Sequence, residues 1–252
     1  MSQSTFKDHF STDSAGYATF RPHYPRALIA YAASLAPAHT CVWDCATGNG
    51  QAAVPLAEEF ESVFASDASE EQIKHATPHP RVTYRVGLSD ASGLDDRSVD
   101  LVTVAQALHW LPHDRFFAEV RRVLVPGGVL AVWCYMKPTL GGGPLEAIFD
   151  RYYSETCKPY WAPERLLVDS GYATVEMPFN DLDTPSFAIE APLSLDDFAG
   201  YVRTWSATRN LAKAIGRDPV LELREELSTS WGPSSRVVRW PIRVRAGRVT
   251  VA

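Results

Sequence analysis

The residues best placed to do chemistry follow a short apolar run at positions 41–43. That run ends at the acid Asp44, and a turn of small residues follows, including Gly48 and Gly50. Glycine adopts backbone angles that other residues avoid, and without a side chain it lets a ligand come close to the main chain. Apolar residues at helical spacing come next, at positions 52–60. This order predicts a strand, a ligand-binding turn and a helix.

A second acid stands where such a unit needs one. Roughly twenty residues further on, another apolar run ends at Asp67. In a unit of strand, helix and strand, an acid at this place lies beside the glycine turn and can accept hydrogen bonds from both hydroxyls of a ribose. The spacing therefore indicates a cofactor that contains a nucleoside.

The turn itself indicates which cofactor. The dinucleotide fingerprint is G-x-G-x-x-G, whereas the turn from Ala46 reads A-x-G-x-G, followed by Gln51 and Ala52, so the third glycine is missing. A pyrophosphate prefers the positive end of a helix, and the negative charge of Asp44 at the turn disfavours it. An acid there suits a cationic group better, such as a sulfonium or an amine.

The remaining elements are predicted from periodicity. Apolar runs predict strands at 41–43, 62–66, 82–86, 99–105 and 129–135, and helical patterns separate them. Such alternation is typical of a parallel, doubly wound α/β sheet. Beyond it we expect helices at 144–156, 165–170, 195–214 and 219–227, strands at 174–179 and 187–190, and a final antiparallel strand pair within 236–251. Ser69 and Ser194 are expected to be helix N-caps.

These motifs together resemble a known family. The pattern Asp44-x-Ala46-x-Gly48-x-Gly50, then Asp67, the segments Ser-Asp-Ala at 89–91, Ala-Leu-His-Trp-Leu at 107–111 and Leu-Val-Pro-Gly-Gly-Val-Leu at 124–130 are similar to class I methyltransferases that use S-adenosylmethionine. Within that family the chain most resembles the small-molecule branch that includes trans-aconitate methyltransferases. One departure is Ala46, where the family usually has glycine.

The resemblance implies a fold and a set of divisions. It implies a Rossmann-like sheet of seven strands, mostly parallel with one antiparallel strand, and a helical cap from the C-terminal half. We expect one domain over residues 1–252. Its parts are a lid segment at 6–36, a cofactor-binding core at 37–136, a cap and acceptor segment at about 137–232, and a final strand region at 233–252.

The resemblance also implies the residues that hold S-adenosyl-L-methionine. They are Tyr17, Arg21, Asp44, Ala46, Thr47, Gly48, Gly50, Gln51, Asp67, Ala68, Ser89, Asp90, Ala91 and Gln106. Asp67 is the candidate for the ribose and Asp90 for the adenine amino group. Tyr17 and Arg21 belong to an aromatic segment that either folds over the cofactor as a lid or packs on the sheet as a strap, and both interpretations stay open.

The acceptor side is less defined. His109 is the one base candidate with positional support, although it can equally form the pocket wall or bond the backbone. Methyl transfer is an in-line displacement that depends on positioning, and a carboxylate acceptor needs no base whereas a hydroxyl profits from one. The candidates for acceptor binding are His23, Trp110, Tyr135, Arg203 and Trp205. An anionic acceptor needs positive charge, which Arg21, His23 or Arg203 could supply.

Composition narrows the class of protein further. The net charge of -6 argues against a nucleic-acid partner, because no basic surplus exists to meet phosphates. No apolar run reaches the roughly 18 residues of a membrane span, and the N-terminus lacks the features of a signal peptide. We therefore expect a cytoplasmic monomer or homodimer with a small-molecule acceptor. The four cysteines form no C-x-x-C pair, so neither a disulfide nor a metal is expected.

Two other functions compete with methyl transfer. A non-catalytic module that binds S-adenosylmethionine has Ala46 as its only support. A nicotinamide-dependent oxidoreductase on a similar sheet is opposed by the missing third glycine and by Asp44. We expect the enzyme, with methylation of a small molecule, for which a carboxylic acid is the candidate.

Overall fold

The structure of the protein is a computed structural model, and it describes residues 23–250. The proposed lid residues Tyr17 and Arg21 lie outside the described residues. The described chain forms one mixed sheet in the order β3-β2-β1-β4-β5-β8-β6, with β7 also pairing with β8. The strands are β1 (Cys41–Cys45), β2 (Ser62–Asp67), β3 (Val82–Val86), β4 (Val99–Ala105), β5 (Leu124–Tyr135), β6 (Asn180–Leu182), β7 (Phe187–Leu193) and β8 (Arg236–Arg248).

The central strands are parallel and buried on both faces. β4 pairs in parallel with β1 and β5, and only the last residue of β4 has any appreciable exposure. Alternate side chains enter two separate cores: Val42 and Leu101 face one, and Trp43 and Val102 face the other. A strand between two apolar layers is expected to be largely apolar, which is the near-continuous run seen in the sequence. The doubly wound α/β prediction is confirmed.

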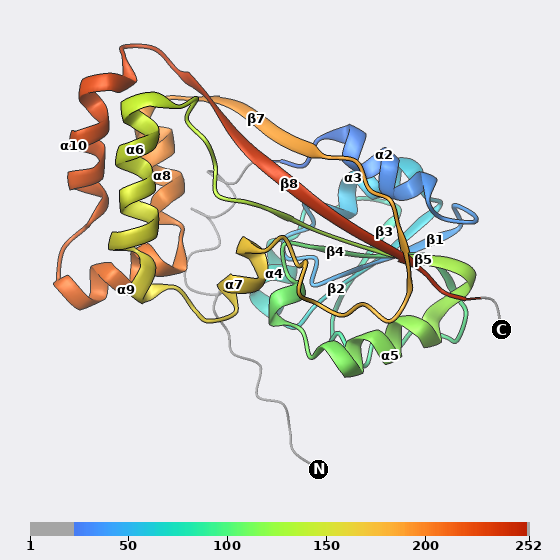
Figure 1. The fold of residues 1–252 in the computed structure, drawn as a ribbon. Helices are drawn as coiled ribbons and strands as arrows, with labels where there is room; N and C mark the ends of the chain where they lie inside the picture. Colours follow the sequence, from blue (N-terminus) through green and yellow to red (C-terminus); the bar gives the residue numbers. More distant parts are fainter. Residues whose placement is uncertain (1–22, 251–252) are drawn as a thin grey trace.

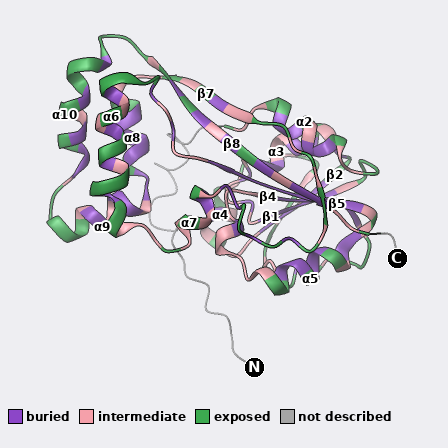
Figure 2. Cartoon of the chain, in the orientation of Figure 1, coloured by how far each residue is buried: buried purple, intermediate pink, exposed green. Residues whose placement is uncertain are grey.

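Helices cover both faces of this sheet (Figure 1). α2 and α3 contribute to one core, and α5 contributes to the other. Figure 2 shows the inner faces of these helices buried and their outer faces exposed. The helices are α2 (Arg26–Ser34), α3 (Ala53–Glu59), α4 (Glu70–Lys74), α5 (His113–Val123), α6 (Gly143–Arg151), α7 (Arg165–Asp169), α8 (Leu195–Arg203), α9 (Ser206–Ile215) and α10 (Val220–Trp231).

The sheet has eight strands, whereas seven were predicted. β8 is the antiparallel strand, and it is long enough for two short strands to pair with it one after the other. β7 pairs with residues 236–242 and β6 with residues 246–248. Pro185 lies between these two strands, and proline has no backbone N–H to continue a ladder. The outer position of the sheet is therefore divided in two.

Two strand predictions near the C-terminus were wrong. Residues 174–179 are not a strand, and residues 236–248 form a single strand instead of an antiparallel pair. An antiparallel pair would need a turn within this stretch, but β8 runs without a break through Gly247. A Cβ atom on Gly247 would lie 2.6 Å from the Cβ of Phe179, so this glycine allows close packing and makes no turn.

The helix expected over 195–214 is two helices. The Thr204 hydroxyl donates to the Tyr201 carbonyl at 2.6 Å, and Trp205 has extended backbone angles, so α8 ends and α9 begins in a new direction. Both predicted N-caps are confirmed. The Ser194 hydroxyl accepts from the Asp197 N–H in a reciprocal capping box, and the Ser69 hydroxyl accepts from the Gln72 N–H.

Helices α6, α8 and α10 stand side by side beyond one end of β8, with α9 beneath them (Figure 1). Aromatic contacts hold this group together. The ring centroid of Phe198 lies 5.1 Å from that of Phe149 and 5.2 Å from that of Trp231. Trp231 is buried here, so it is an anchor between helices and does not line a pocket.

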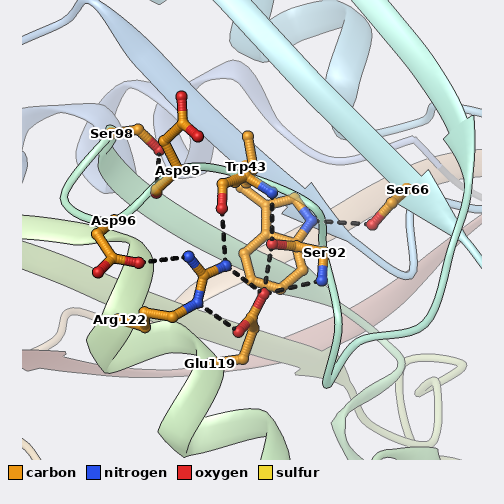
Figure 3. A network of polar contacts seen from close by, with 9 residues as sticks. Trp43, Ser66, Ser92, Asp95, Asp96, Ser98, Glu119 and Arg122 are labelled. Atoms are coloured by element: carbon orange, nitrogen blue, oxygen red, sulfur yellow. Dashed lines mark hydrogen bonds and ion pairs between the residues drawn. The ribbon is translucent and has the colours of Figure 1, made fainter.

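An ion-pair network ties α5 to the loop between β3 and β4 (Figure 3). The Glu119 carboxylate accepts from the Ser92 N–H and hydroxyl, and it also pairs with Arg122 at 2.8 Å. Arg122 in turn donates to Asp96 and to the Leu94 carbonyl. These hydrogen bonds, above all those from Arg122, lower the pKa of Glu119 to about 2. The network fixes the loop whose first residues reach the functional site.

Candidate functional site

A cavity of about 420 Å³ lies beyond the carboxyl ends of the parallel strands. Its lining comes mainly from the turns after β1, β2, β3 and β4 and from the end of β5, with single residues from the segment before α2, from α4, from α5 and from the position before α7. This is the edge at which open α/β sheets bind ligands, and the volume falls within the roughly 300–1,000 Å³ usual for small-molecule pockets. The cavity therefore has the place and size of a cofactor site.

The turn after β1 forms the floor of this cavity. Ala46 has a φ of 56° and Gly48 a φ of 58°, so the backbone is left-handed at both positions. The Thr47 N–H donates to the Ser66 carbonyl at 3.0 Å, which joins the turn to the end of β2. A left-handed backbone conformation costs an alanine only about 1–2 kcal/mol, so the turn accommodates Ala46 without a change.

Asp67 joins two turns at this edge. Its Oδ2 accepts from the Gly48 N–H at 2.9 Å, and its Oδ1 accepts from the Ser69 N–H at 2.8 Å. The carboxylate lines the cavity beside Gly48, where a Cβ atom would meet only the Gln72 side chain, at 3.7 Å. An acid in this setting, next to a turn open to close approach, fits the ribose of a nucleoside.

Asp44 faces inward. It is fully buried and lies outside the cavity lining. Its two oxygens accept from the Thr47 hydroxyl at 2.6 Å and from the Thr103 hydroxyl at 2.7 Å. Burial raises the pKa of Asp44 to about 6, although both hydrogen bonds oppose the shift. The sequence argument placed this acid against a cationic ligand, whereas the structure shows it bracing the turn from behind.

The loop after β3 provides a second acid. Asp90 lines the cavity and pairs with Arg115 of α5, with Nε 3.1 Å from Oδ2. Ser89 lines the cavity beside it, while Ala91 lies outside the lining and donates its N–H to the Leu88 carbonyl. Arg115 therefore fixes the direction of the Asp90 carboxylate within the cavity.

Comparison with known proteins decides the family. A family model described as a methyltransferase domain matches residues 43–132. A protein of Dictyostelium discoideum, provisionally named a methyltransferase, is 33% identical over 230 residues, which cover 88% of this chain and 86% of the relative. A solved structure from Anaeromyxobacter dehalogenans, provisionally named a type II methyltransferase, has a TM-score of 0.87 and 43% identity over 92% of this chain and 100% of that one.

The chain is a class I methyltransferase. Its cofactor is S-adenosyl-L-methionine, so the nicotinamide and non-catalytic alternatives are set aside. A Saccharomyces cerevisiae protein provisionally named an S-adenosylmethionine-dependent methyltransferase is also similar, with 24% identity over 80% of this chain. The cavity, the close-approach turn and Asp67 fit this cofactor. None of these relatives establishes the trans-aconitate branch.

Gln106 joins the ends of β4 and β5. Its Oε1 accepts from the Tyr135 N–H at 2.7 Å, and its own N–H donates to the Trp133 carbonyl at 2.8 Å. The φ of Gln106 is 56°, which turns the chain sharply into the segment carrying His109. Both Gln106 and Tyr135 line the cavity, so the two strand ends form one rigid wall.

His109 lies in that wall as a neutral imidazole. Its Nδ1 is 3.0 Å from the Tyr172 hydroxyl oxygen, and its ring lies against Trp110. Burial lowers the pKa of His109 to about 3, and the positive charge of Arg165 adds to the shift. A group with this pKa stays unprotonated at neutral pH and has little tendency to take up a proton.

A smaller cavity of about 70 Å³ adjoins the first. The two share Gln106, His109, Trp110 and Tyr135 in their linings. The other residues lining the smaller cavity come from the loop after β5, from the start of α7, and from α8 and α9, and they are Pro138, Trp161, Ala162, Arg165, Tyr201, Thr204, Trp205, Ser206 and Arg209. The methyltransferase thus has a second chamber directly behind the rim of the cofactor cavity.

The structure brings most of the sequence-derived candidates to these two cavities. Those that line the larger cavity are Ala46, Thr47, Gly48, Gln51, Asp67, Ala68, Ser89, Asp90, Gln106, His109, Trp110 and Tyr135, and Trp205 lines the smaller one. Outside both linings are Asp44, Gly50 and Ala91. His23 is exposed and also lies outside both, and Arg203 instead pairs with Asp218 at 2.8 Å.

Sequence reasoning missed several lining residues. Arg115, Glu164 and Arg165 bring charge to the two cavities from α5 and from the region of α7. No motif signals them, because each is a charged residue within or beside a helix and only packing points it inward. Asn49 and Gln72, by contrast, stand within or next to recognised motifs and could have been included on position alone.

Three further features of the described residues concern the cysteines, metal ligands and apolar helices. All four cysteines are free thiols. Within residues 23–250, no group of three His, Cys, Asp or Glu side chains is arranged to hold a metal ion. A search of that same part of the chain finds no helix with the length and apolar character needed to cross a membrane.

Proposed function

We propose that this methyltransferase acts on a small organic molecule that carries a carboxylate, as the resemblance to the trans-aconitate branch suggests. The observation that supports it is the pair of adjoining cavities, which meet at the ends of β4 and β5. A reactant in each cavity would meet its partner at Gln106, His109, Trp110 and Tyr135. The smaller cavity limits the acceptor to a compact molecule, and helices α8 and α9 help to enclose it.

When bound, S-adenosylmethionine supplies a methyl group that is already activated by its positively charged sulfur. The chain then has to hold the acceptor in line and exclude water, which can lower a barrier by roughly 7–11 kcal/mol. Gln106 and Tyr135 suit this task because their mutual hydrogen bond fixes the wall between the cavities. Asp67 is assigned to the ribose and Asp90 to the adenine amino group.

His109 is proposed to hold the acceptor by a hydrogen bond, as a neutral imidazole. It is a poor general base because its pKa is lowered to about 3. An acceptor hydroxyl would gain little from it, whereas a carboxylate is ionised at neutral pH without help. The state of His109 therefore favours an acceptor that needs no deprotonation at the moment of transfer.

The test has two stages. Calorimetric titration with S-adenosylmethionine and S-adenosylhomocysteine first measures cofactor binding. Transfer of a labelled methyl group is then measured with a panel of small carboxylic acids and their matched amides. We expect product from one or more acids and none from the amides. Transfer to the amides at rates equal to those of the acids would refute the proposed acceptor class.

A further inference from the structure

The smaller cavity has a distinct charge. Two arginines line it, Arg165 and Arg209, and none of its described lining residues is acidic. Its walls are otherwise largely aromatic. The centroid of the Trp205 ring lies 5.5 Å from that of Trp161 and 5.6 Å from that of Tyr201. A chamber with flat apolar walls and positive charge favours a flat anion.

Arg165 is held firmly on one side. Its Nε donates to Asp169 Oδ1 at 3.0 Å and to the Tyr153 hydroxyl at 3.1 Å, and its Nη2 donates to the same hydroxyl at 2.9 Å. The guanidinium carbon lies 4.8 Å from the centroid of the Trp161 ring. Only 19% of the Arg165 side chain is exposed. Stacking and hydrogen bonds thus fix the plane and direction of the fork.

The other side of the Arg165 guanidinium has unused N–H donors. A guanidinium has five N–H groups, and no described residue accepts a hydrogen bond from Nη1 of Arg165. The Asp169 carboxylate balances part of the charge, but it is 40% exposed and does not line the cavity. A buried arginine with unused donors is a built site for a carboxylate, which the planar fork can bind through two parallel hydrogen bonds.

The position of Arg165 fixes how an acceptor would lie. Arg165 lines only the smaller cavity, while His109 belongs to the rim that both cavities share. The guanidinium is nevertheless close enough for its charge to lower the pKa of His109. A carboxylate on Arg165 would therefore sit behind the rim, with the rest of the molecule directed toward the cofactor cavity.

Building on the proposed methyl transfer, we propose that Arg165 anchors the carboxylate of a compact, flat organic acid and selects it over neutral molecules of the same shape. The smaller cavity, of about 70 Å³, encloses only a compact part of a molecule. This matches a carboxylate with part of a ring. Arg165 is then a specificity-determining residue that the sequence motifs do not reveal.

The test uses benzoate and its neutral isostere benzamide as probes. Each is titrated into the full-length protein saturated with S-adenosylhomocysteine, and binding is followed by calorimetry. We expect the unaltered protein to bind benzoate about tenfold or more tightly than benzamide, since a charge-assisted pair contributes at least that factor. Equal binding of the two probes by the unaltered protein would overturn the proposal without any variant.

Variants then assign the preference to one residue. Arg165→Gln should bring the ratio of the two affinities close to one, and Arg165→Lys should keep part of it, because lysine retains charge and loses the fork. Arg224→Gln is the matched control, since Arg224 pairs with Asp196 at 2.6 Å on the surface and lines neither cavity. A full benzoate preference in Arg165→Gln would contradict the assignment. Unchanged affinity for S-adenosylhomocysteine shows that each variant is folded.

The outcome is separable from that of the proposed function. If no acid in the panel is methylated but benzoate still binds in an Arg165-dependent way, the anion site stands and the proposed acceptor class falls. If acids are methylated while Arg165→Gln leaves their KM unchanged, the assignment of Arg165 falls alone.

Discussion

The change Gly50→Ala tests the central turn most directly. Gly50 is buried, has a φ of 89° and lies outside the cavity lining. An added Cβ atom would stand 2.1 Å from the Tyr84 hydroxyl oxygen and 3.0 Å from its ring carbon Cζ. The Tyr84 hydroxyl donates to the Thr77 carbonyl at 2.8 Å. The methyl group therefore cannot enter unless Tyr84 moves away from that partner.

The cost follows from these contacts. The positive φ costs an alanine about 1–2 kcal/mol. Displacing Tyr84 costs its hydrogen bond, about 1 kcal/mol, and some packing. We therefore expect the free energy of unfolding to fall by about 2–4 kcal/mol, which lowers the Tm of a domain this size by roughly 5–15 °C. Because Gly50 does not face the cavity, affinity for S-adenosylhomocysteine should change less than stability does.

Gly48→Ala is the matched control for stability. Its φ is 58°, close to that of Ala46, and a Cβ atom there would meet only Gln72 Oε1, at the ordinary distance of 3.7 Å. It should cost about 1 kcal/mol. Urea unfolding of both variants, at equal protein concentration, measures the difference. The reasoning fails if Gly50→Ala is no less stable than Gly48→Ala.

A double-mutant cycle isolates the clash. Tyr84→Phe removes the hydroxyl that lies nearest to the added methyl group, and the nearest ring carbons are then at 3.0 and 3.2 Å. In that background Gly50→Ala should cost about 1 kcal/mol less than in the unaltered protein. Additive costs would show that the contact with the Tyr84 hydroxyl does not contribute to the loss.

Three further predictions concern charge. Glu119→Gln should destabilise the protein by about 2–3 kcal/mol in urea unfolding at pH 7, because the pKa of Glu119 is lowered to about 2. This stabilisation is fully present above the pKa of the unfolded carboxyl, near 4.3, and is lost as the pH falls toward 2. The stabilities of the variant and the unaltered protein should therefore converge in acid. Asp67→Ala should weaken S-adenosylhomocysteine binding by about tenfold or more in calorimetry, and unchanged affinity would reject the ribose assignment. His109→Gln should leave the shape of the kcat/KM profile between pH 5 and 8 unchanged, because His109 is neutral throughout that range, whereas loss of an acidic limb near pH 6 would identify it as a titrating base.

Much of the fold follows from local sequence patterns. β4 is largely apolar because both of its faces are covered, and that near-continuous run is visible without any structure. A turn that lets a ligand approach closely requires small residues, which explains the glycine and alanine after β1. A ribose requires a hydrogen-bond acceptor, which explains the prediction of an acid at the end of β2. Ser69 and Ser194 were assigned as caps because a hydroxyl one residue before a helix satisfies a free N–H. Each of these signals depends on neighbours in sequence.

Other features were decided by contacts between distant residues. Asp44 turns inward because the hydroxyl of Thr103, on another strand, completes its hydrogen bonds. The stretch 236–248 forms one strand and not two, and Phe179 packs closely against Gly247 inside it. Arg165 reaches the smaller cavity only because Tyr153, Asp169 and Trp161 hold its guanidinium there.

The sequence by itself determined the parallel strands of the sheet, the cofactor turn and the acids beside it. Periodicity and turn chemistry are properties of consecutive residues, so they can be recognised without a structure. The tertiary structure alone decided which acid faces the larger cavity and which charged side chains line the smaller one. The physical reason is that the direction of a polar side chain is set by the partners that satisfy it, and those partners come from elements far apart in the chain.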